Sequence, residues 1–294
     1  MRSVSSLVNR RVWVARVGGA TELGALAVAR SNSARRARAS RTKAMRLWWQ
    51  LVVLAALIGC WQLIVSLKLV DRVIAKSPKQ VFDFLEHAAG SGSLWSNTAD
   101  TLEAVLVAFA LAAACGVVLG IGLGLLPRVN RVISPFLDAA NAMPRIALAP
   151  VFIVWLGIGI EAKIALAFSV VIFVVLSAAQ AGVRSADPEI VRLSTVLGIS
   201  RSQMFVKVLL PVSVPAVFAG LRLGLVYSLL AVVGSEIISA QNGLGQQIAL
   251  YSGQFEMQAV YGILIVLAVI AALLNSFMGM AERWLLRWHP TAAS

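Results

Sequence analysis

The sequence predicts an all-α, polytopic membrane protein, and three observations support this fold class. The chain is 59% hydrophobic and only 13% charged over 294 residues, and its mean hydropathy is +0.84. Soluble domains do not have such a composition. Six apolar segments each come close to the ~20 residues that a helix needs to cross a bilayer. They cover approximately residues 47–67, 102–126, 134–157, 163–183, 214–235 and 259–281.

The chain opens with a separate basic region, residues 1–46. It holds eleven Lys/Arg and one acidic residue, Glu22, and we expect a disordered tail. Three explanations stay open: a tail beside anionic lipid, a transit-peptide-like segment, or sequence upstream of a true start at Met45. The remainder has fifteen basic and twelve acidic residues, so nucleic acid is not an expected partner.

The distribution of positive charge predicts the orientation of the spans. An even number of spans places both termini on one side, and with the N-terminus inside, nineteen Lys/Arg fall inside and five outside. Both termini are therefore expected in the cytoplasm. The expected divisions are the tail 1–46, a first span with outer loop 47–101, a core 102–285 with a cytoplasmic loop 184–213, and a C-terminal tail 286–294.

Small and polar residues distinguish the second and third segments. Gly116, Gly120 and Gly124 recur every four residues, a spacing that predicts close helix packing. The third segment is not expected to be one straight helix, and a broken polar helix at membrane depth is tolerated only where it lines a cavity or is buried in protein. We therefore expect it to form part of a translocation pathway. Its prolines are Pro135, Pro144 and Pro150, and its polar candidates are Asp138, Asn141 and Arg145.

Two further ionisable residues lie within or at the end of the fifth segment, Arg222 and Glu236. Ionisable groups in a span are costly and often functional, so both are candidates for the pathway. The alternative is structural: an Arg–Glu or Arg–Asp bridge that only holds helices together, or a Glu236 that simply lies at the outer interface.

A polar stretch at 187–215 separates the fourth and fifth segments, and it has the signals of two short helices. Asp187 is a suitable N-cap with Pro188 at N1, and Gly198 suits the left-handed position that ends a helix. Ser200 and Gln203 then form a capping box for the second helix. Pro211 is expected to end that second helix, because proline has no N–H.

Both helices of this stretch are amphipathic. Ile190, Leu193 and Leu197 share one face of the first helix, and Arg192 and Arg201 lie largely elsewhere. Such a pair can dock in a groove of a soluble partner, or it can fold against its own lipid-facing helices. The helix signals alone favour neither interpretation.

The spacing in this stretch resembles the cytoplasmic loop of binding-protein-dependent ABC importer permeases. Gly198 is followed after nine residues by VLLP at 208–211, as in that family. The usual Glu-Ala-Ala is replaced by Arg192-Leu193-Ser194, and the nearest acid is Glu189. Further phrases over about residues 95–285 are similar to permeases of the nitrate, taurine and alkanesulfonate type: PRIALAP at 144–150, WLGIG at 155–159, GLR at 220–222 and GLG at 243–245.

The resemblance implies a type I ABC importer transmembrane domain of about six helices in a bacterial inner membrane. Its implied partners are a second permease copy, two ATPase subunits, the lipid bilayer and an extracytoplasmic solute-binding protein. Small anions such as sulfonates or nitrate are consistent with Arg145 and Arg222, but permeases of similar sequence also carry uncharged and even cationic compounds, so the substrate stays open. The residues that the resemblance assigns to ATPase coupling are Glu189, Arg192, Ser194, Gly198, Arg201 and Pro211.

The chain itself is not expected to be an enzyme. It lacks the G-x-x-x-x-G-K-[ST] loop that cradles nucleotide phosphates, so ATP hydrolysis would occur in a separate subunit. Cys60 and Cys115 each lie in an apolar segment, where a lone cysteine is usually a small buried hydrophobe, and we expect neither a metal nor a cofactor. The main alternative is an ion-coupled secondary transporter, which tends to show a mid-membrane acid and an internal repeat. A weaker one is a membrane scaffold or sensor.

Overall fold

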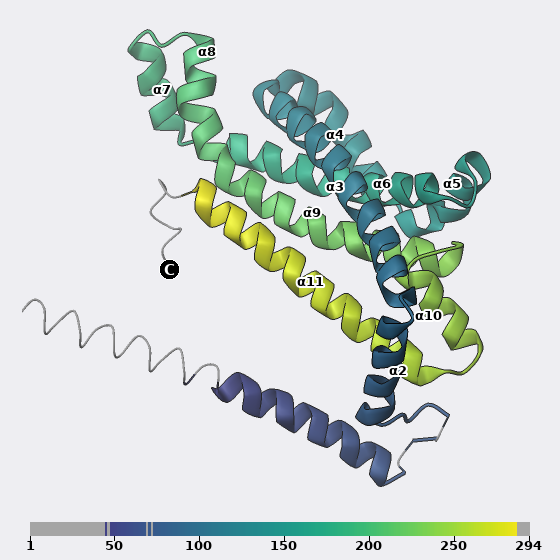
Figure 1. Cartoon of the computed structure of the whole chain (residues 1–294). Helices are drawn as coiled ribbons and strands as arrows, with labels where there is room; N and C mark the ends of the chain where they lie inside the picture. The colour runs from purple at the N-terminus through teal and green to yellow at the C-terminus, as the bar shows by residue number, and fades with distance from the viewer. Residues whose placement is uncertain (1–44, 46–47, 69, 72, 287–294) are drawn as a thin grey trace, which may run out of the picture. The chain divides into compact units, whose positions relative to one another are not determined.

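The computed structural model describes residues 45, 48–68, 70–71 and 73–286, and these form helices joined by short connections (Figure 1). Residues 1–69 and 70–294 make two units. The first unit contributes the helix Trp48–Ser66, which confirms the first predicted span. The expected basic tail, apart from residue 45, and the C-terminal tail beyond residue 286 lie outside the described residues.

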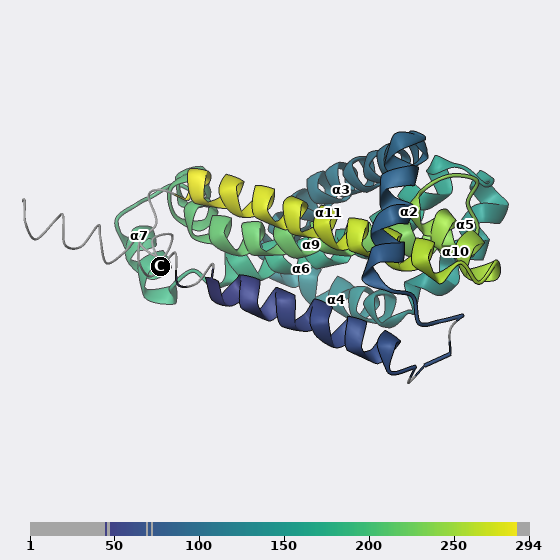
Figure 2. The same cartoon turned by 60° about the horizontal axis from the view of Figure 1, so that its bottom comes forward.

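Four long helices form the body of the second unit: α3 (Ser93–Leu125), α6 (Ile160–Arg184), α9 (Leu210–Ile238) and α11 (Met257–Leu285). Within the described residues, five helices are long and apolar enough to cross a membrane, or six if one bent pair counts as a span. This agrees with the six segments predicted from hydropathy. Figure 2 shows α3, α9 and α11 running along a common direction.

The bent pair is the predicted third segment. It consists of α4 (Pro127–Ala142), the 3-10 turn η1 (Arg145–Leu148) and α5 (Ala149–Leu156), and its two halves differ in direction by 82°. Met143 adopts an extended conformation, as the residue before a proline prefers. Pro144 therefore makes the break, which confirms that this segment is not one straight helix.

The glycine repeat lies where α3 crosses α6. A Cβ added at Gly116 would lie 2.9 Å from the carbonyl oxygen of Ile172, and one at Gly120 or Gly124 would clash with α6 in the same way. The repeat therefore allows the two backbones to approach closely, as predicted. α6 packs most extensively on α3 and α9. The large apolar side chains at the centre of this packing are Val105, Leu166, Val171, Val175, Val232, Leu244 and Ile263.

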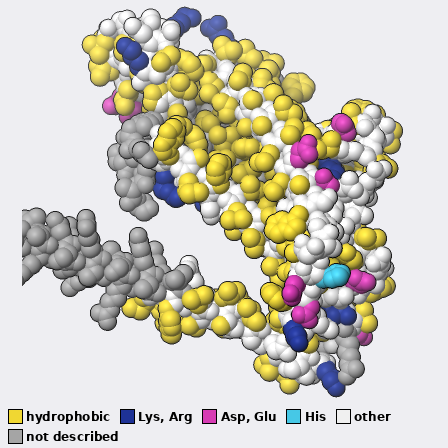
Figure 3. All heavy atoms as spheres, in the orientation of Figure 1, with side chains coloured by type: hydrophobic (Ala, Val, Ile, Leu, Met, Phe, Trp, Pro, Cys, Tyr) yellow, Lys and Arg dark blue, Asp and Glu magenta, His cyan; other side chains and the backbone are white. Residues whose placement is uncertain are grey.

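Short helices lie at the two ends of the bundle (Figures 1 and 2). α7 (Pro188–Val196) and α8 (Arg201–Met204) form one end, and α2 (Pro78–Gly90) and α10 (Leu244–Gly253) lie at the other. Between the two ends the visible face of α9 and α11 is mostly hydrophobic, and charged side chains gather at the ends (Figure 3). This arrangement is the one that a bilayer requires.

The expectation that Pro211 ends the second short helix is wrong. Residues Arg201–Ile238 form one continuous helix, in which a π-helical turn, η2 (Phe205–Leu209), joins α8 to α9. Within this turn Leu210 N–H donates to the carbonyl of Phe205, so the chain shifts its hydrogen-bond register directly before Pro211. Proline offers no N–H to the turn before it, and the π-turn changes the hydrogen-bond register at this point, so the helix continues through Pro211.

Candidate functional site

The end of the molecule formed by α7 and α8 is built by local capping. The Asp187 carboxylate accepts the N–H of Glu189 at 2.8 Å and starts α7. The chain then reverses at Gly198, whose φ of +77° is a conformation that favours glycine. Ser200 and Gln203 form the predicted capping box that starts α8. Three caps that the sequence predicted correctly thus define where the two helices begin and end.

The apolar face of α7 points away from the protein. Ile190, Leu193, Val196 and Leu197 are 52%, 61%, 79% and 71% exposed. Ile190, Leu193 and Val196 also line a shallow cavity of about 540 Å³, whose wall includes Asp187, Glu189 and Arg192. The interpretation that this stretch folds against its own lipid-facing helices is therefore not supported. A contiguous apolar face of this kind on a solvated helix indicates a protein interface.

The residues predicted to couple this end to an ATPase fall into two groups. Glu189, Arg192, Gly198 and Arg201 are exposed on the α7–α8 surface. Ser194 is buried, with 8% exposure, and its carbonyl accepts the N–H of Ile199 at 3.2 Å across the turn. Pro211 is half-buried inside the long helix. The first group is therefore accessible to a partner, whereas Ser194 is buried within α7 and Pro211 lies inside the long helix.

Arg145 lies at the break of the third span. Its Nη1 donates to the carbonyls of Ser169 and Val170 on α6, at 2.6 and 3.1 Å. Its Nη2 donates to the carbonyl of Ala140 at 3.2 Å and to Oδ1 of Asn141 at 3.0 Å. The carbonyl of Ala140 lies in the last turn of α4, where carbonyl groups have no donor within their own helix. Arg145 therefore caps α4 and joins it to α6.

A cavity of about 510 Å³ adjoins this break. Its polar wall consists of Asn141, Arg145 and Tyr227, and its apolar wall includes Val174 and Leu230. The volume is in the range of small-molecule sites. Two of the predicted pathway residues, Asn141 and Arg145, thus line one cavity. Asp138 is exposed on α4 and is not part of its wall.

Arg222 makes contacts within the bundle. Its Nε donates to Oδ1 of Asn275 at 2.6 Å, and its Nη1 lies 3.8 Å from Oε2 of Glu282. Both partners are on α11, so Arg222 links α9 to α11. It is not part of the Arg145 cavity wall. Arg222 therefore makes the Arg–Glu bridge between helices that the sequence analysis gave as the alternative to a pathway role.

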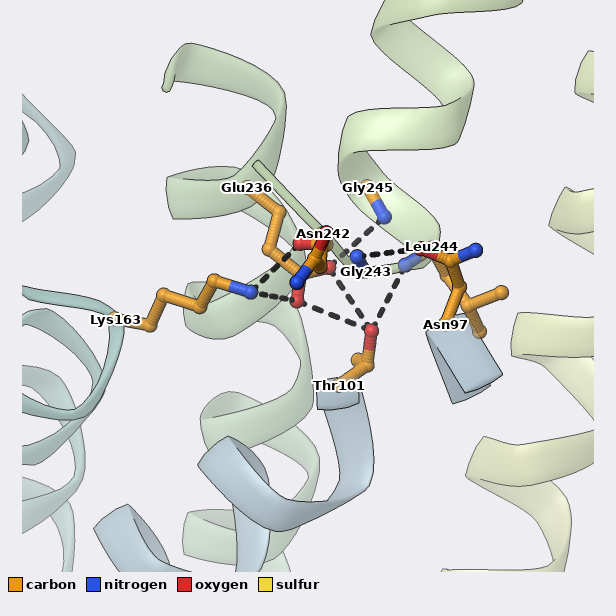
Figure 4. Close-up of polar contacts among 8 residues, drawn as sticks. All are labelled: Asn97, Thr101, Lys163, Glu236, Asn242, Gly243, Leu244 and Gly245. Atoms are coloured by element: carbon orange, nitrogen blue, oxygen red, sulfur yellow. Dashed lines mark hydrogen bonds and ion pairs between the residues drawn. The ribbon is translucent and has the colours of Figure 1, made fainter. Parts of the chain in front are cut away.

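Glu236 is almost completely buried, with 1% exposure, rather than lying at the outer interface. Its carboxylate pairs with Nζ of Lys163 on α6 at 2.9 Å. It also accepts the hydroxyl of Thr101 on α3 at 3.0 Å and the backbone N–H of Gly245 at 2.9 Å. Figure 4 shows these groups converging from α3, α6, α9 and the start of α10. The charge is thus neutralised and hydrogen-bonded, as burial requires.

The same cluster holds the loop that precedes α10. Lys163 Nζ donates to the carbonyl of Asn242 at 2.7 Å. The N–H of Leu244 donates to Oγ1 of Thr101 at 2.9 Å, and the N–H of Gly243 donates to Oδ1 of Asn97 at 2.8 Å. The unpaired N–H groups at the start of α10 are therefore satisfied by side chains of α3 and α9. We call Thr101, Lys163 and Glu236 the buried triad.

Sequence reasoning missed two members of the buried triad. Lys163 counted as an outer charge, although it opens an apolar segment, and Thr101 carried no signal. One signal could have suggested the pairing. A charged lysine at the start of a span is costly unless it has a partner, and Glu236 lies at the end of another span on the same side. Which acid pairs with which base depends on which helices are neighbours in the folded protein, and this cannot be read from a single sequence.

Within the described residues, five or six apolar helices, a capped helix pair at one end and a cavity beside a broken span are the features expected of a multi-pass membrane transport subunit. Residues 116–288 match the family described as binding-protein-dependent transport system inner membrane component. The chain belongs to this family, and it is an ABC importer permease of the inner membrane. The secondary-transporter and scaffold alternatives are not supported.

Individual relatives agree with this assignment. The taurine transport system permease protein TauC of Escherichia coli is 31% identical over 80% of this chain and 88% of its own length. The riboflavin transport system permease protein RibX of Chloroflexus aurantiacus is 32% identical over 81% of this chain and 89% of its own. A solved structure of the MetNI methionine ABC transporter in an inward-facing conformation matches 64% of this chain and 95% of its own, with a TM-score of 0.56 and 19% identity. The fold is therefore that of a type I importer transmembrane domain.

Proposed function

We propose that the α7–α8 pair is the docking surface for an ATPase subunit that drives import through this permease. The observation that carries the proposal is the exposed apolar face of α7, formed by Ile190, Leu193, Val196 and Leu197. Their helix, α7, lies at one end of the bundle (Figure 1), on a polar stretch outside the candidate membrane spans. An amphipathic helix that presents such a face fits a hydrophobic groove on a partner. ATP hydrolysis takes place in that partner and not in this chain.

The continuous helix Arg201–Ile238 provides a route for coupling. It begins in the docking surface as α8 and crosses the bundle as α9. It passes Tyr227 at the cavity and ends beside Glu236. When ATP binding closes the ATPase pair, a displacement of α8 passes along this continuous helix to Tyr227 in the cavity wall. Alternating access of the cavity follows from this motion.

The remaining partners follow from the family. A second copy of the chain completes the pathway, lipid covers the other apolar faces, and an extracytoplasmic binding protein delivers a small solute. The matched relatives are named for taurine, which carries a sulfonate, and for riboflavin. The pathway residues that this proposal retains are Asn141 and Arg145, because both line the cavity. Arg222 and Glu236 act through helix packing.

The test is purification from the native membrane followed by reconstitution. The tagged chain is solubilised in mild detergent, and co-purifying subunits are identified by mass spectrometry. We expect an ATPase with a phosphate-binding loop to co-purify, and we expect reconstituted vesicles to need ATP for uptake. A chain that purifies alone and transports in vesicles without ATP would contradict the proposal.

A further inference from the structure

The long helix that contains α9 is attached to a further helix at each of its ends. At one end it begins as α8, within the continuous helix Arg201–Ile238. At the other end the chain leaves α9, passes through a short loop and starts α10 at Leu244. The first N–H groups of a helix have no partner within it, and in α10 they donate to side chains of α3 and α9. The start of α10 is therefore joined to both helices by side chains as well as by the loop.

Thr101 lies at the centre of these contacts. Its hydroxyl accepts the N–H of Leu244 at 2.9 Å and donates to the Glu236 carboxylate at 3.0 Å. The same carboxylate accepts the N–H of Gly245 at 2.9 Å. The hydrogen bonds thus form a connected network from α3 through α9 to α10 (Figure 4). Thr101 and Glu236 are buried, so each of these bonds is costly to break.

The packing at this point is equally close. A Cβ added at Gly245 would lie 2.5 Å from the carbonyl oxygen of Val233 and 2.7 Å from Cβ of Glu236, so the first turn of α10 rests directly on α9. Further along α10, the ring of Tyr251 packs edge-on against Phe84 of α2, with the ring centroids 5.5 Å apart. Close-packed elements transmit displacements. A movement of this end of α9 therefore moves α10, and through Tyr251 it reaches α2.

We propose that Thr101 and Glu236 are positioning residues that make α10 follow α9 during transport. The proposal rests on the proposed importer function, and it adds the joint at which the motion of α9 reaches the surface formed by α2 and α10. This joint stays closed throughout the transport cycle, because opening it would leave the Leu244 N–H and the Glu236 carboxylate without partners in a buried site. The long helix thus runs from the α7–α8 docking surface to the joint at Glu236.

The test measures spin-label distances between two copies of the permease in the purified complex with its ATPase. Cys60 and Cys115 are replaced by Ser, and one label is attached through Leu250→Cys on α10 or through Val206→Cys on the long helix beside α8. Both side chains are exposed. The distances are recorded without nucleotide and with ATP and vanadate, and the measurement needs no substrate. We expect both distances to change when ATP is bound.

A matched pair of substitutions shows whether Thr101 carries the motion. Thr101→Val keeps the shape of the side chain but cannot accept the Leu244 N–H. It should shift the attachment equilibrium of α10 about fivefold or more, the factor for one buried donor left unpaired. The Leu250 distance should then broaden and lose its response to ATP, while the Val206 distance keeps it. Thr101→Ser retains the hydroxyl and should preserve both responses.

Ser228→Ala is the control for loss of a buried hydroxyl. The Ser228 hydroxyl donates to the carbonyl of Val105 at 2.9 Å, so it links α9 to α3 rather than to α10. This variant should keep the ATP response at both labels. A general loss of stability would affect both labels alike, whereas a broken joint affects the label on α10.

Two results would overturn the proposal while the importer function stands. One is an ATP response at Val206 without one at Leu250 in the chain with Thr101, or an unchanged Leu250 response in the Thr101→Val variant. The other is faster hydrogen exchange at Leu244 with ATP than without it, because the joint would then open during the cycle. No response at either label, or no ATPase in the complex, would overturn the importer proposal and this one with it.

Discussion

Replacing Glu236 by Ala is expected to lower the free energy of unfolding by about 3–5 kcal/mol, the range for breaking a buried ion pair. The substitution leaves Lys163, which is 6% exposed, without its counter-charge. It also removes the acceptor of the Thr101 hydroxyl and of the Gly245 N–H. The measurement is thermal or denaturant unfolding of the purified protein in detergent. Hydrogen exchange at Leu244 and Gly245 should accelerate in the same variant.

Further variants show whether the charge pair is responsible. Lys163→Met should also destabilise, and the double variant Lys163→Met/Glu236→Ala should lose less than the two single changes added together, by about 0.5–3 kcal/mol. Glu161→Gln is the matched control, because Glu161 is an acid in the first turn of α6 and takes no part in the buried triad. Its effect should stay below about 1 kcal/mol. Strict additivity in the double variant would mean that the pair does not act as a unit.

Gly198→Val is expected to reduce ATP-driven uptake by about 5–30-fold while the protein still inserts and folds. The φ of Gly198 is +77°, and a side chain in this region costs about 1–2 kcal/mol. That energy changes the population of the docked turn by the stated factor. Among the described residues, its chain neighbours aside, no atom lies within 4 Å of an added Cβ, so the loss comes from backbone strain and from the partner. Uptake and ATPase activity are measured together in vesicles.

The matched control for this position is Gly198→Asn. Asparagine is close to valine in volume, but it visits the left-handed region readily. If strain is the cause, the Gly198→Asn variant should retain most of the uptake that Gly198→Val loses. If both variants lose uptake equally, the added bulk blocks the partner. Normal uptake with Gly198→Val would remove the α7–α8 turn from the coupling path.

Local features of this fold were predictable from sequence because local physics determines them. The spans follow from hydropathy, the caps at Asp187 and Ser200 follow from side chains that bond nearby N–H groups, and the glycine repeat follows from its four-residue spacing. Each of these signals lies within one helix or one turn. The structure confirms them.

Features that depend on distant segments were not predictable. Lys163 and Glu236 are 73 residues apart, and no periodicity links them. The partners of Arg145 on α6 are backbone carbonyls, which every residue has, so no side-chain pattern marks them. The prediction at Pro211 failed for a different reason. Proline usually ends a helix, but in this chain a π-turn lies directly before it and the helix continues.

The central claim is that α7 touches an ATPase, and site-specific cross-linking tests it most directly. Cys60 and Cys115 are exposed on their helices rather than buried as expected, so both are first replaced by Ser. A single cysteine is then introduced by Val196→Cys or, as control, by Ser194→Cys, for labelling with a short photo-cross-linker. Val196 is 79% exposed and Ser194 only 8%, although both belong to α7. We predict an adduct with the ATPase subunit from position 196 and little or none from position 194. Adducts from position 196 with the chain itself or with lipid, and none with an ATPase, would contradict the account.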